Sequence, residues 1–541
     1  MSNGIFNVPV PTNEPIFDYA PGSKERLGLE AALEALQAEV KEIPVIIGGE
    51  AYYTGHKKPC IQPDNHQKII GYYHEVTEEL VDKAIESALN AKDEWEKMPY
   101  EHRSAVFLKA ADLISTTWRY KMNAATMLCQ SKNAYQSEID SVCELIDFLR
   151  YNAYFLDQIY KEQGNSSMDT WNRINYTGLD GFVYAVSPFN FTAIGGNLPS
   201  APALAGNVVL WKPASAAVYS NYMVMEILIE AGIPKGVINF LPGASDMITN
   251  KVLQHPDFSG FHYTGSTKVF SKIWSDIGNN IKRYKSYPRI VGETGGKNFV
   301  FAHESADFKA LSIALIRGAF EYQGQKCSAA SRAYIPRNLW ENTWGHMLPR
   351  LKEITTGPVT DFKNFVNAVI DEKAFDKIKG YIDEARNSSE AEILIGGQCD
   401  KSSGYFIEPT VILTTNPKFK TMEEEIFGPV LTIYIYENEN FDEALKLCQT
   451  TSEYALTGAI FSKDRQVLNL LENALGTCAG NFYINDKPTG AVVGQQPFGG
   501  SKASGTNDKA GSKLNLFRWM NMRLVKENFK EIHDYKYPFM G

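Results

Sequence analysis

The feature that most limits how this chain can fold is an alternation of short apolar runs with helical patterns, which begins at Gly181. Apolar runs separated by helices indicate a parallel sheet with helices on both faces. A second half with the same alternation extends from Asn298 to about residue 480. The sequence therefore predicts an α/β protein in two halves. The predicted strands of the first half are 182–186, 208–213, 237–241 and 261–263, and its predicted helices are 218–231, 246–254 and 267–278.

The chain before Gly181 has a different character. Residues 1–24 are rich in Pro, Asn and turn-forming residues and predict an extended arm. Residues 46–52 predict a hairpin around a glycine turn, and the aromatic, basic tail from residue 512 has no core of its own. We expect that tail to pack on another domain or subunit. Apolar periodicity predicts helices at 24–41, 101–117, 119–132 and 135–163, and Thr77 predicts the N-cap of another.

Length and composition limit the classes of function. With 541 residues, the chain is too long for one core and predicts two to four domains. The net charge of −9 argues against nucleic acid as a partner, and no window of about twenty apolar residues predicts a membrane span. The seven cysteines never form a Cys-x-x-Cys pair, which predicts a reducing compartment without a zinc site or a disulfide framework.

The N-terminus bears on location. Residues 1–11 lack both an apolar signal core and an Arg-rich presequence. The sequence as written predicts a cytoplasmic protein, or one of the mitochondrial matrix if a transit peptide has been removed.

One cysteine stands in a setting that favours reactivity. Cys327 follows Gly324 and precedes Ser328, in a stretch that comes directly after a helical run. Where the chain changes direction, backbone N–H groups are free, and such groups at a helix end lower the pKa of a thiol and make it nucleophilic. Most free cysteines are buried and inert, so this position alone favours the interpretation as a core residue.

A glutamate upstream strengthens the catalytic interpretation. Glu293 is followed by Gly295 and Gly296, on backbone that can approach a ligand closely, and its carboxylate is a candidate general base. Together the two segments resemble the NAD(P)-dependent aldehyde dehydrogenase superfamily, in which a Glu-x-Gly-Gly-Lys segment precedes a Gly-Gln-x-Cys segment. The resemblance implies that Cys327 is the nucleophile, that Glu293 is the base and that no metal is needed.

The resemblance also implies an architecture. It consists of a Rossmann-like NAD-binding domain, a second α/β catalytic domain and a small β element for oligomerisation, so we expect a homodimer or a higher homo-oligomer. The implied assignment gives 1–163 and 181–290 to the NAD-binding domain, 291–485 to the catalytic domain, 164–180 and 510–541 to the oligomerisation element, and 486–509 to a substrate anchor loop.

Ser187 and Asn190 follow the first predicted strand, at the edge where open α/β sheets bind ligands. An asparagine after proline is more often a turn residue, whereas an amide aimed at an oxyanion can be worth about 3 kcal/mol in the transition state. The match to the superfamily's Pro-Phe/Trp-Asn motif favours the oxyanion role for Asn190. It also implies that Ser187 contacts the cofactor.

Lys212 ends the next predicted strand. A lysine there is usually a solvated rim charge, but in the superfamily this lysine holds the adenosine ribose. Many NAD-specific members carry a glutamate shortly after it, which repels the 2′-phosphate of NADP, and this chain has Ser215 at that position. The implied cofactor is therefore NAD, with NADP not excluded.

Two further segments complete the implied cofactor site. Residues 263–270 read as strand, glycine turn and helix start, where free N–H groups favour a pyrophosphate. Phe270 replaces the superfamily's glycine, which leaves the closeness of that contact open. Residues 423–430 match a Glu-x-Phe-Gly-Pro motif that contacts the nicotinamide ribose and ring, although three glutamates are usually a solvated face. The implied contacts are Gly265, Ser266, Thr267, Lys268, Val269, Glu425 and Phe427.

Within the superfamily, three stretches resemble the Δ1-pyrroline-5-carboxylate dehydrogenases, namely 187–197, 321–331 and 494–508. This resemblance covers nearly the whole chain, including the arm at Asn13, Glu14 and Pro15. It implies NAD-dependent oxidation of L-glutamate γ-semialdehyde to L-glutamate in proline degradation, through a thiohemiacetal and a thioester. The implied substrate contacts are Ser328, Gly490 and Ala491 at the amino acid end, and Phe191 and Phe498 along the methylenes.

Two alternatives stay open on the sequence. Another semialdehyde dehydrogenase would use the same core with a different anchor loop. A binding or structural protein on a retired enzyme scaffold would no longer need the reactive side chains, so the presence of Cys327, Glu293 and Asn190 favours an enzyme.

Overall fold

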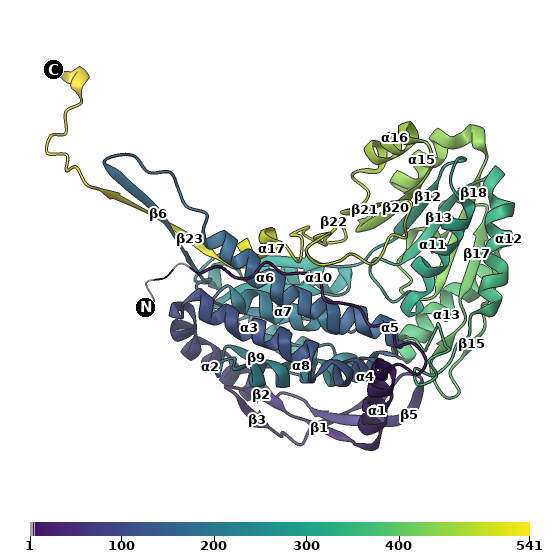
Figure 1. The fold of residues 1–541 in the computed structure, drawn as a ribbon, viewed down its shortest axis with the longest axis horizontal. Helices are drawn as coiled ribbons and strands as arrows, with labels where there is room; N and C mark the ends of the chain where they lie inside the picture. The colour runs from purple at the N-terminus through teal and green to yellow at the C-terminus, as the bar shows by residue number, and fades with distance from the viewer. Residues whose placement is uncertain (1–3, 5) are drawn as a thin grey trace.

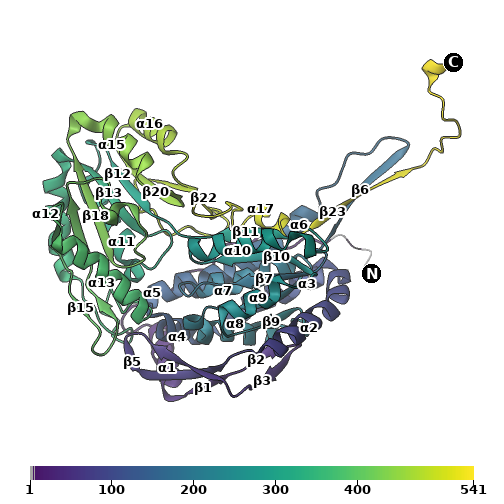
Figure 2. The same ribbon diagram turned by 180° about the vertical axis from the view of Figure 1, so that it is seen from behind.

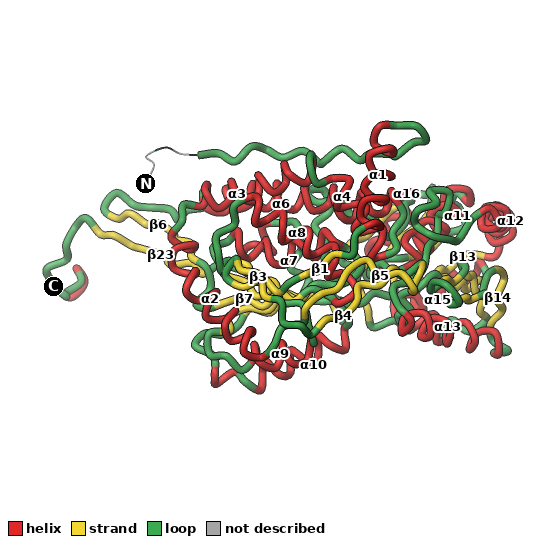
Figure 3. The backbone as a smooth tube through the Cα atoms, turned by 90° about the horizontal axis from the view of Figure 1, so that it is seen from below, coloured by secondary structure: helices red, strands yellow, loops and turns green. Residues whose placement is uncertain are grey.

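The structure is a computed structural model that describes residue 4 and residues 6–541 (Figure 1). Residues 1–3 and 5 lie outside the described residues. They belong to the predicted arm and to the N-terminal segment from which location was predicted. Residues 6–20 contain no helix or strand, as predicted for an arm. Figure 3 shows this arm running along the outer side of helices α3 (Tyr100–Ser115), α6 (Glu144–Tyr160) and α4 (Arg119–Gln130) before it reaches α1 (Lys24–Ala38).

The first half of the chain forms a seven-stranded sheet in the order β11-β10-β7-β8-β9-β2-β3. Its first five strands are parallel, and the order of the chain reverses between β7 and β10. The four strands predicted from apolar runs are confirmed. The bounds are β2 (Val45–Ile47), β3 (Glu50–Tyr52), β7 (Phe182–Val186), β8 (Val208–Lys212), β9 (Ile238–Phe240), β10 (Phe258–Thr264) and β11 (Arg289–Glu293).

Both faces of this first sheet are buried, which explains why its strands are apolar throughout. Val183 and Ala185 of β7 belong to one core cluster, and the alternating residues Phe182 and Tyr184 belong to another. Helices α3, α4, α6, α7 and α8 cover the first face, and α2, α9 and α10 cover the second. The helices not yet defined are α2 (Glu78–Lys97), α7 (Thr192–Leu204), α8 (Val218–Ala231), α9 (Ser245–Leu253) and α10 (Thr267–Asn279).

The second half forms another seven-stranded sheet, in the order β14-β17-β18-β13-β12-β20-β21, in which all pairs but β14–β17 are parallel. Its strands are β12 (Asn298–Ala302), β13 (Ala330–Pro336), β14 (Ala391–Ile395), β17 (Thr410–Thr414), β18 (Val430–Tyr436), β20 (Thr457–Phe461) and β21 (Asn481–Ile484). Its helices are α11 (Phe308–Phe320), α12 (Arg337–Glu353), α13 (Glu372–Asn387), α14 (Lys420–Glu423), α15 (Phe441–Thr450) and α16 (Arg465–Leu475). The predicted α/β architecture is confirmed for both halves.

The two sheets meet end to end across the functional site. Residues 294–297 alone separate the carboxyl end of β11 from the amino end of β12. The chain therefore passes directly from the carboxyl ends of the strands of the first sheet to the amino ends of the strands of the second. Figure 2 shows the two sheets in separate lobes, with β7, β10 and β11 in one and β12, β13 and β18 in the other.

A two-stranded ribbon projects from the body of the molecule (Figures 1 and 2). It consists of β6 (Thr170–Thr177) and β23 (Asn521–Asn528), which pair antiparallel along their whole length. Both strands fall within the segments expected to mediate oligomerisation. By contrast, β11 pairs with β10 in the first sheet, although most of it lies in the range predicted for the catalytic domain. The predicted division into domains stays a prediction.

The helix expected over 135–163 is in fact three elements. It consists of α5 (Ala134–Ser137), a π-helical turn η1 (Glu138–Cys143) and α6. The wider π turn places two acidic side chains in the interior, where Glu138 bonds to Arg119 and Asp140 bonds to Lys132. Apolar periodicity carries no signal for such tertiary pairing, so the sequence predicted one continuous helix.

The remaining strands form one three-stranded sheet and two two-stranded sheets beside the two large ones. No helix in the described part of the chain is both long and apolar enough to cross a membrane. The strands are β1 (Lys41–Ile43), β4 (Lys57–Gln62), β5 (Asn65–His74), β15 (Cys399–Asp400), β16 (Phe406–Ile407), β19 (Tyr454–Ala455) and β22 (Ser501–Lys502), and the last helix is α17 (Lys513–Phe517).

Candidate active site

Cys327 lies in a sharply bent turn between α11 and β13. Tyr322, Gln323 and Gly324 all have positive φ angles, of 51°, 55° and 64°. The Gln323 amide holds this strained backbone by donating to the carbonyls of Ser131 and Ala368, at 2.9 and 2.8 Å. A Cβ atom at Gly324 would lie 2.2 Å from the Gly428 carbonyl oxygen, so this position requires glycine. The bend brings Cys327 to the amino end of the second sheet.

Asn298 fixes the backbone at Cys327, and the sequence analysis did not identify this role. Its amide nitrogen donates to the carbonyl oxygens of Cys327 at 2.7 Å and Ala329 at 2.9 Å. Its side-chain oxygen accepts from the N–H of Thr457 at 3.0 Å. An asparagine directly after the Gly-Gly-Lys segment was the available signal, but its partners are far away in the sequence.

The loop after β11 brings three predicted motifs together. Glu293 is the last residue of β11, and Gly295 and Gly296 follow it. A Cβ atom at Gly295 would lie 2.7 Å from a carboxylate oxygen of Glu425, and one at Gly296 would lie 2.3 Å from the Cys327 carbonyl oxygen. The N–H of Gly296 donates to Glu425 at 2.8 Å. The double glycine is thus needed because the loop passes between Glu425 and Cys327.

Glu293 lies in a buried environment that bears on its predicted role as a general base. Burial raises the pKa of its carboxyl well above the ordinary value, and the charge of Lys509 opposes this only in part. One of its two carboxylate oxygens is buried and has no hydrogen-bond partner within the described residues. A buried oxygen without a partner is costly for stability, and it is free to accept a proton from water.

Burial also raises the pKa of the Cys327 thiol, and the charge of Glu293 adds to the effect. The sequence predicted the opposite direction, from free N–H groups at a helix end. The physical reason is the loss of solvent around the thiol: the Ser328 N–H acts in the predicted direction, but burial outweighs it.

Asn190 connects the first sheet to the turn of Cys327. It is buried, and its amide nitrogen donates to the carbonyl oxygen of Gln325 at 2.9 Å. This contact leaves the second hydrogen of the amide. Within the described residues, the N–H of Cys327 donates no backbone hydrogen bond. The second amide hydrogen of Asn190 and the Cys327 N–H are therefore both free to donate.

The predicted cofactor residues line the carboxyl edge of the first sheet. Lys212 is buried at the end of β8, and burial, the one cause of the shift, lowers its pKa to about 8. Ser187 accepts from the Trp211 indole at 3.0 Å, and Ser215 is exposed nearby. A buried ammonium without an anionic neighbour fits a binding site for a polar group such as a ribose.

The glycine turn at the start of α10 forms the helix N-terminus that the sequence predicted. Ser266 is the N-cap and accepts from the N–H of Val269 at 3.3 Å, while Gly265 and Lys268 flank it at the surface. The Phe270 ring is buried and lies where a Cβ atom on Gly292 would meet it at 2.2 Å. Its bulk is therefore accommodated in the core beneath α10.

Thr267 and Phe427 complete the predicted cofactor contacts. The Thr267 hydroxyl accepts from the N–H of Gly295 at 3.2 Å and links α10 to the loop after Glu293. Phe427 has a φ angle of 62°, and its ring packs edge-on against Phe189 at 5.8 Å between centroids. Phe427, in the segment that precedes β18, thus contacts the segment that follows β7.

A pocket of about 260 Å³ opens beside the thiol and contains every predicted substrate residue. The Ser328 and Thr489 hydroxyls lie 2.7 Å apart, which joins the nucleophile's neighbour to the anchor loop. In the described chain, the N–H groups of Gly490 and Ala491 donate no hydrogen bond. The predicted residues in the lining are Cys327, Ser328, Gly490, Ala491, Phe191 and Phe498.

Several charged and polar side chains of this pocket were missed by the sequence analysis. Burial raises the pKa of Glu144 well above the ordinary value and raises that of Asp147 to about 6. Both residues come from α6, and the arm contributes Asn13 and Glu14. Helical periodicity places Glu144 and Asp147 on a helix, but it does not indicate that their side chains line the pocket.

The described residues contain no group of three His, Cys, Asp or Glu side chains that would hold a metal ion. The donors at the carboxyl edge of the first sheet instead fit a dinucleotide. Lys212 supplies a buried cation, and the amino end of α10 supplies free N–H groups. Glu425 adds a buried carboxylate, whose pKa burial raises.

Comparisons with known proteins agree with this geometry. The model of the aldehyde dehydrogenase family matches residues 52–525. The mitochondrial Δ1-pyrroline-5-carboxylate dehydrogenase of Dictyostelium discoideum is 51% identical, over 99% of this chain and 96% of that protein. Its human counterpart is 44% identical, over 98% of this chain and 94% of that protein. The crystal structure of the Mycobacterium tuberculosis enzyme bound with NAD has a TM-score of 0.97 and 48% identity, over the full length of both chains.

Proposed function

The chain belongs to the aldehyde dehydrogenase family and oxidises L-glutamate γ-semialdehyde to L-glutamate with NAD, and we propose that Cys327, Glu293 and Asn190 carry out this chemistry. The substrate is the open form of Δ1-pyrroline-5-carboxylate, and its oxidation is a step of proline degradation. The observation that supports these roles most is the Gly295–Gly296 loop, which lies against both Cys327 and Glu425 and begins at Glu293.

Cys327 is the nucleophile of the proposed mechanism. Its thiolate adds to the aldehyde carbon and forms a thiohemiacetal, whose oxyanion accepts hydrogen bonds from the Asn190 amide and the Cys327 N–H. Loss of hydride from that carbon leaves a thioester on Cys327. NAD, when bound, supplies the hydride acceptor. Asn298 contributes by fixing the carbonyl of Cys327, and with it the direction of the thiol.

Glu293 completes the cycle by activating water. Its unpartnered carboxylate oxygen takes a proton from water, the hydroxide oxygen bonds to the thioester carbon, and the Cys327 sulfur leaves. The products are L-glutamate and the Cys327 thiolate, and the proton that Glu293 took from water is available to the thiolate or to solvent. The raised pKa of Glu293 makes its carboxylate a stronger base than an exposed one.

The cofactor contacts are proposed from the carboxyl edge of the first sheet. Lys212 and Ser187 would hold the adenosine side, with Ser215 close by. The amino end of α10, from Gly265 to Val269, would hold the pyrophosphate. Glu425 and Phe427 would hold the nicotinamide ribose and ring. NADP is not excluded, because Ser215 carries no negative charge to repel its 2′-phosphate.

The substrate contacts are proposed from the pocket. The free N–H groups of Gly490 and Ala491 and the Ser328 hydroxyl would bind the amino acid end, while Phe191 and Phe498 would pack on the methylenes. A site built to hydrogen-bond polar groups leaves its donors unpaired when a substrate lacks them. Such a mismatch can cost about 10⁴-fold in specificity.

NADH formation with different aldehydes tests this function. Wild-type protein should use Δ1-pyrroline-5-carboxylate far better than butanal, which has the same carbon chain without the amino acid end. Succinate semialdehyde and betaine aldehyde test other members of the superfamily. Equal use of butanal would refute the anchor loop, and absence of NADH with every aldehyde would favour a retired scaffold.

We also propose that the protein is a homodimer or a higher homo-oligomer. The ribbon of β6 and β23 exposes Trp171, Met522 and Leu524, by 51%, 62% and 67%, and such surfaces are usually covered by a partner. Light scattering of the purified protein tests the oligomeric state.

We propose in addition that the protein works in a reducing compartment, such as the cytosol or the mitochondrial matrix. All seven cysteines are free, which suits such a compartment. Cell fractionation tests this location.

A further inference from the structure

We propose that the N-terminal arm is part of the substrate site, and that Asn13 positions the anchor loop and thereby sets the preference for amino acid aldehydes. Asn13 lines the same pocket as Cys327, although more than half of the chain separates them. The inference rests on the proposed role of Gly490 and Ala491 as donors to the substrate.

Asn13 of the arm binds two other segments of the chain through one side chain. Its amide nitrogen donates to the Val493 carbonyl oxygen at 2.7 Å and to the Asp147 carboxylate at 2.8 Å. Its amide oxygen accepts from the Gln495 side chain at 2.8 Å. The arm, helix α6 and the segment just after Ala491 are therefore joined at a single residue.

Residues 490–496, the part of the anchor loop that contains Gly490 and Ala491, depend on Asn13 for their hydrogen bonds with the rest of the molecule. Within residues 490–496, the local hydrogen bonds run from Gln495 and Gln496 to Val492 and from Val492 back to Gln496. In the described part of the chain, the hydrogen bonds that join 490–496 to any other segment are the two made by Asn13. The free N–H groups of Gly490 and Ala491 therefore lie between two fixed points, Thr489, which is bonded to Ser328, and Val493, which is bonded to Asn13 of the arm.

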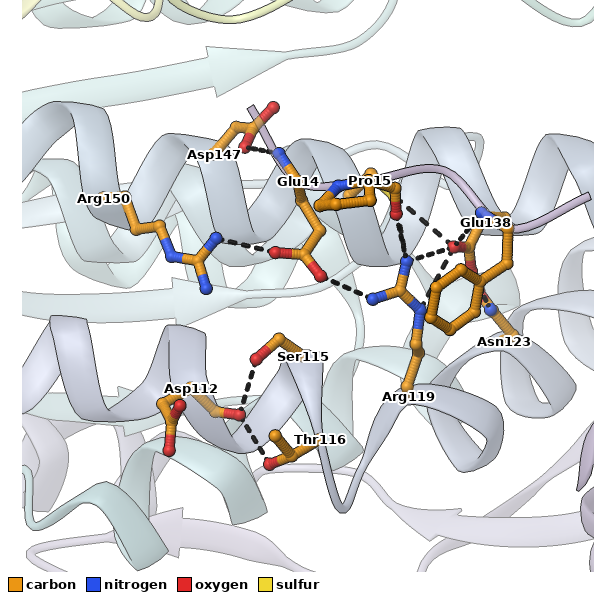
Figure 4. A network of polar contacts seen from close by, with 12 residues as sticks. Glu14, Pro15, Asp112, Ser115, Thr116, Arg119, Asn123, Glu138, Asp147 and Arg150 are labelled. Atoms are coloured by element: carbon orange, nitrogen blue, oxygen red, sulfur yellow. Dashed lines mark hydrogen bonds and ion pairs between the residues drawn. The ribbon is translucent and has the colours of Figure 1, made fainter. Parts of the chain in front are cut away.

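The arm itself is held firmly, as Figure 4 shows. The Glu14 N–H donates to Asp147 at 2.8 Å, and its carboxylate pairs with Arg119 at 2.6 Å and Arg150 at 2.7 Å. The Glu14 side chain is only 9% exposed, so these charges lie largely away from water. Paired and hydrogen-bonded charges in such a setting fix geometry strongly.

The next residues of the arm contact the π-helical turn η1, which forms another part of the pocket lining. The Pro15 carbonyl oxygen accepts from Arg119 at 2.6 Å, and Arg119 also pairs with Glu138. Glu138 accepts in addition from the Phe17 N–H at 3.0 Å and the Tyr19 hydroxyl at 2.7 Å. It opens the π-helical turn whose later residues, with the start of α6, line the pocket. The arm therefore contacts both parts of the pocket lining, residues 490–496 and the π-helical turn with the start of α6.

Kinetics of Asn13→Ala test the proposal. We expect the KM for Δ1-pyrroline-5-carboxylate to rise about tenfold, since the loop loses hydrogen bonds that fix its donors. The kcat for this substrate and the kcat/KM for butanal should stay within about twofold of wild type, because the hydrogen bonds lost do not involve Cys327. Asp18→Ala is the matched control, since this exposed side chain of the same arm accepts only from the nearby Ala20 N–H.

A charge swap separates the loop contact from the contact with α6. In Asn13→Asp combined with Asp147→Asn, an amide again meets a carboxylate between the arm and α6. The Val493 carbonyl oxygen loses its hydrogen bond, because the new aspartate has no N–H to donate. The swap should recover the thermal midpoint lost in Asn13→Asp while the KM stays raised. Recovery of both would assign the effect to α6 and overturn the proposal.

The outcomes also distinguish this proposal from the function on which it rests. Wild-type protein that uses butanal as well as Δ1-pyrroline-5-carboxylate would refute the anchor loop. Wild-type protein that discriminates, with an Asn13→Ala variant that discriminates equally, would refute the role of Asn13 alone. An equal loss of kcat/KM for both aldehydes would mean that the arm only stabilises the fold, and would also refute the role of Asn13 in substrate preference. If Asn13→Ala does not fold, Gln495→Ala removes one of the two bonds from the loop side and is judged by the same criteria.

Discussion

The two seven-stranded sheets are built alike but present opposite ends to the active site. The carboxyl ends of the first sheet provide Lys212 and Glu293, and the segment after β7 provides Asn190. The amino ends of the second sheet provide Cys327, before β13, and Phe427, before β18. Carboxyl ends of parallel strands lie beside helix N-termini, which attract phosphates, whereas amino ends lie beside helix C-termini. The first sheet thus suits an anionic cofactor, and the second presents the nucleophile.

The setting of the thiol fits this division. Burial and the neighbouring carboxylates of Glu293 and Glu425 raise the pKa of Cys327. The proposed cofactor contacts lie mainly on the first sheet, and the proposed nucleophile lies on the second. Binding and chemistry should be separable by substitutions on the two sides.

The largest effect is expected on the second sheet. Cys327→Ala should lower NADH formation by more than about 10⁴-fold, because the other cysteine in the pocket lining, Cys143, has its sulfur held against Glu138 and Arg119. NAD binding, measured by titration calorimetry, should stay unchanged since its contacts lie mainly on the first sheet. Cys448→Ala, in the core of the second half, is the control. Turnover in purified Cys327→Ala would contradict the assignment.

The next effect is expected on the first sheet. Lys212→Met should raise the KM for NAD by roughly 10- to 100-fold, because a hydrogen bond from a charged donor is lost at a buried site. The rate at which iodoacetamide modifies Cys327 in the cofactor-free protein should not change. Lys463→Met removes an exposed lysine far from the site and serves as the control. A slower modification of Cys327 would mean that the two sides are not separable.

The pH dependence sharpens the comparison further. A raised pKa means that Glu293 is less ionised at neutral pH than an exposed glutamate, so the hydrolysis of the thioester should quicken as pH rises. The steady-state rate should increase by up to about tenfold per pH unit until the carboxyl is fully ionised. Glu293→Gln should lose this increase in the steady state. A flat profile in the wild type would argue against Glu293 as the base.

The smallest effect concerns the choice of cofactor. Ser215→Glu should lower the kcat/KM for NADP about tenfold through repulsion of the 2′-phosphate, and should change that for NAD by less than about threefold. Ser215→Gln has the same shape without the charge and is the matched control. Wild-type protein that already rejects NADP firmly would show that another group excludes it.

Much of the fold could be predicted from local pattern. The strand at 182–186 and the helix at 218–231 agree with β7 and α8 in their full bounds, because apolar runs and helical periodicity are local properties. The π-helical turn at Glu138 could not be predicted, since it depends on Arg119 and Tyr19 folding against it. The positive φ angles at Tyr322 and Gln323 escaped prediction for the same reason.

The site was predicted where motifs are contiguous and missed where partners are distant. Cys327, Glu293 and Glu425 were identified by resemblance, and the structure brings them together around one loop. Asn298 and Asn13 were missed as positioning residues, because each acts through backbone atoms far away in the sequence. Their roles depend on tertiary contacts that no spacing rule indicates.

Trapping the acyl-enzyme tests the central claim most directly. Glu293→Gln should form the thioester but hydrolyse it slowly, so rapid mixing with NAD and Δ1-pyrroline-5-carboxylate should give a burst of NADH followed by a slow steady state. Mass spectrometry of the acid-quenched and digested protein should then find the glutamyl thioester on the peptide that contains Cys327. A burst without that adduct, or an adduct on another cysteine, would contradict the account.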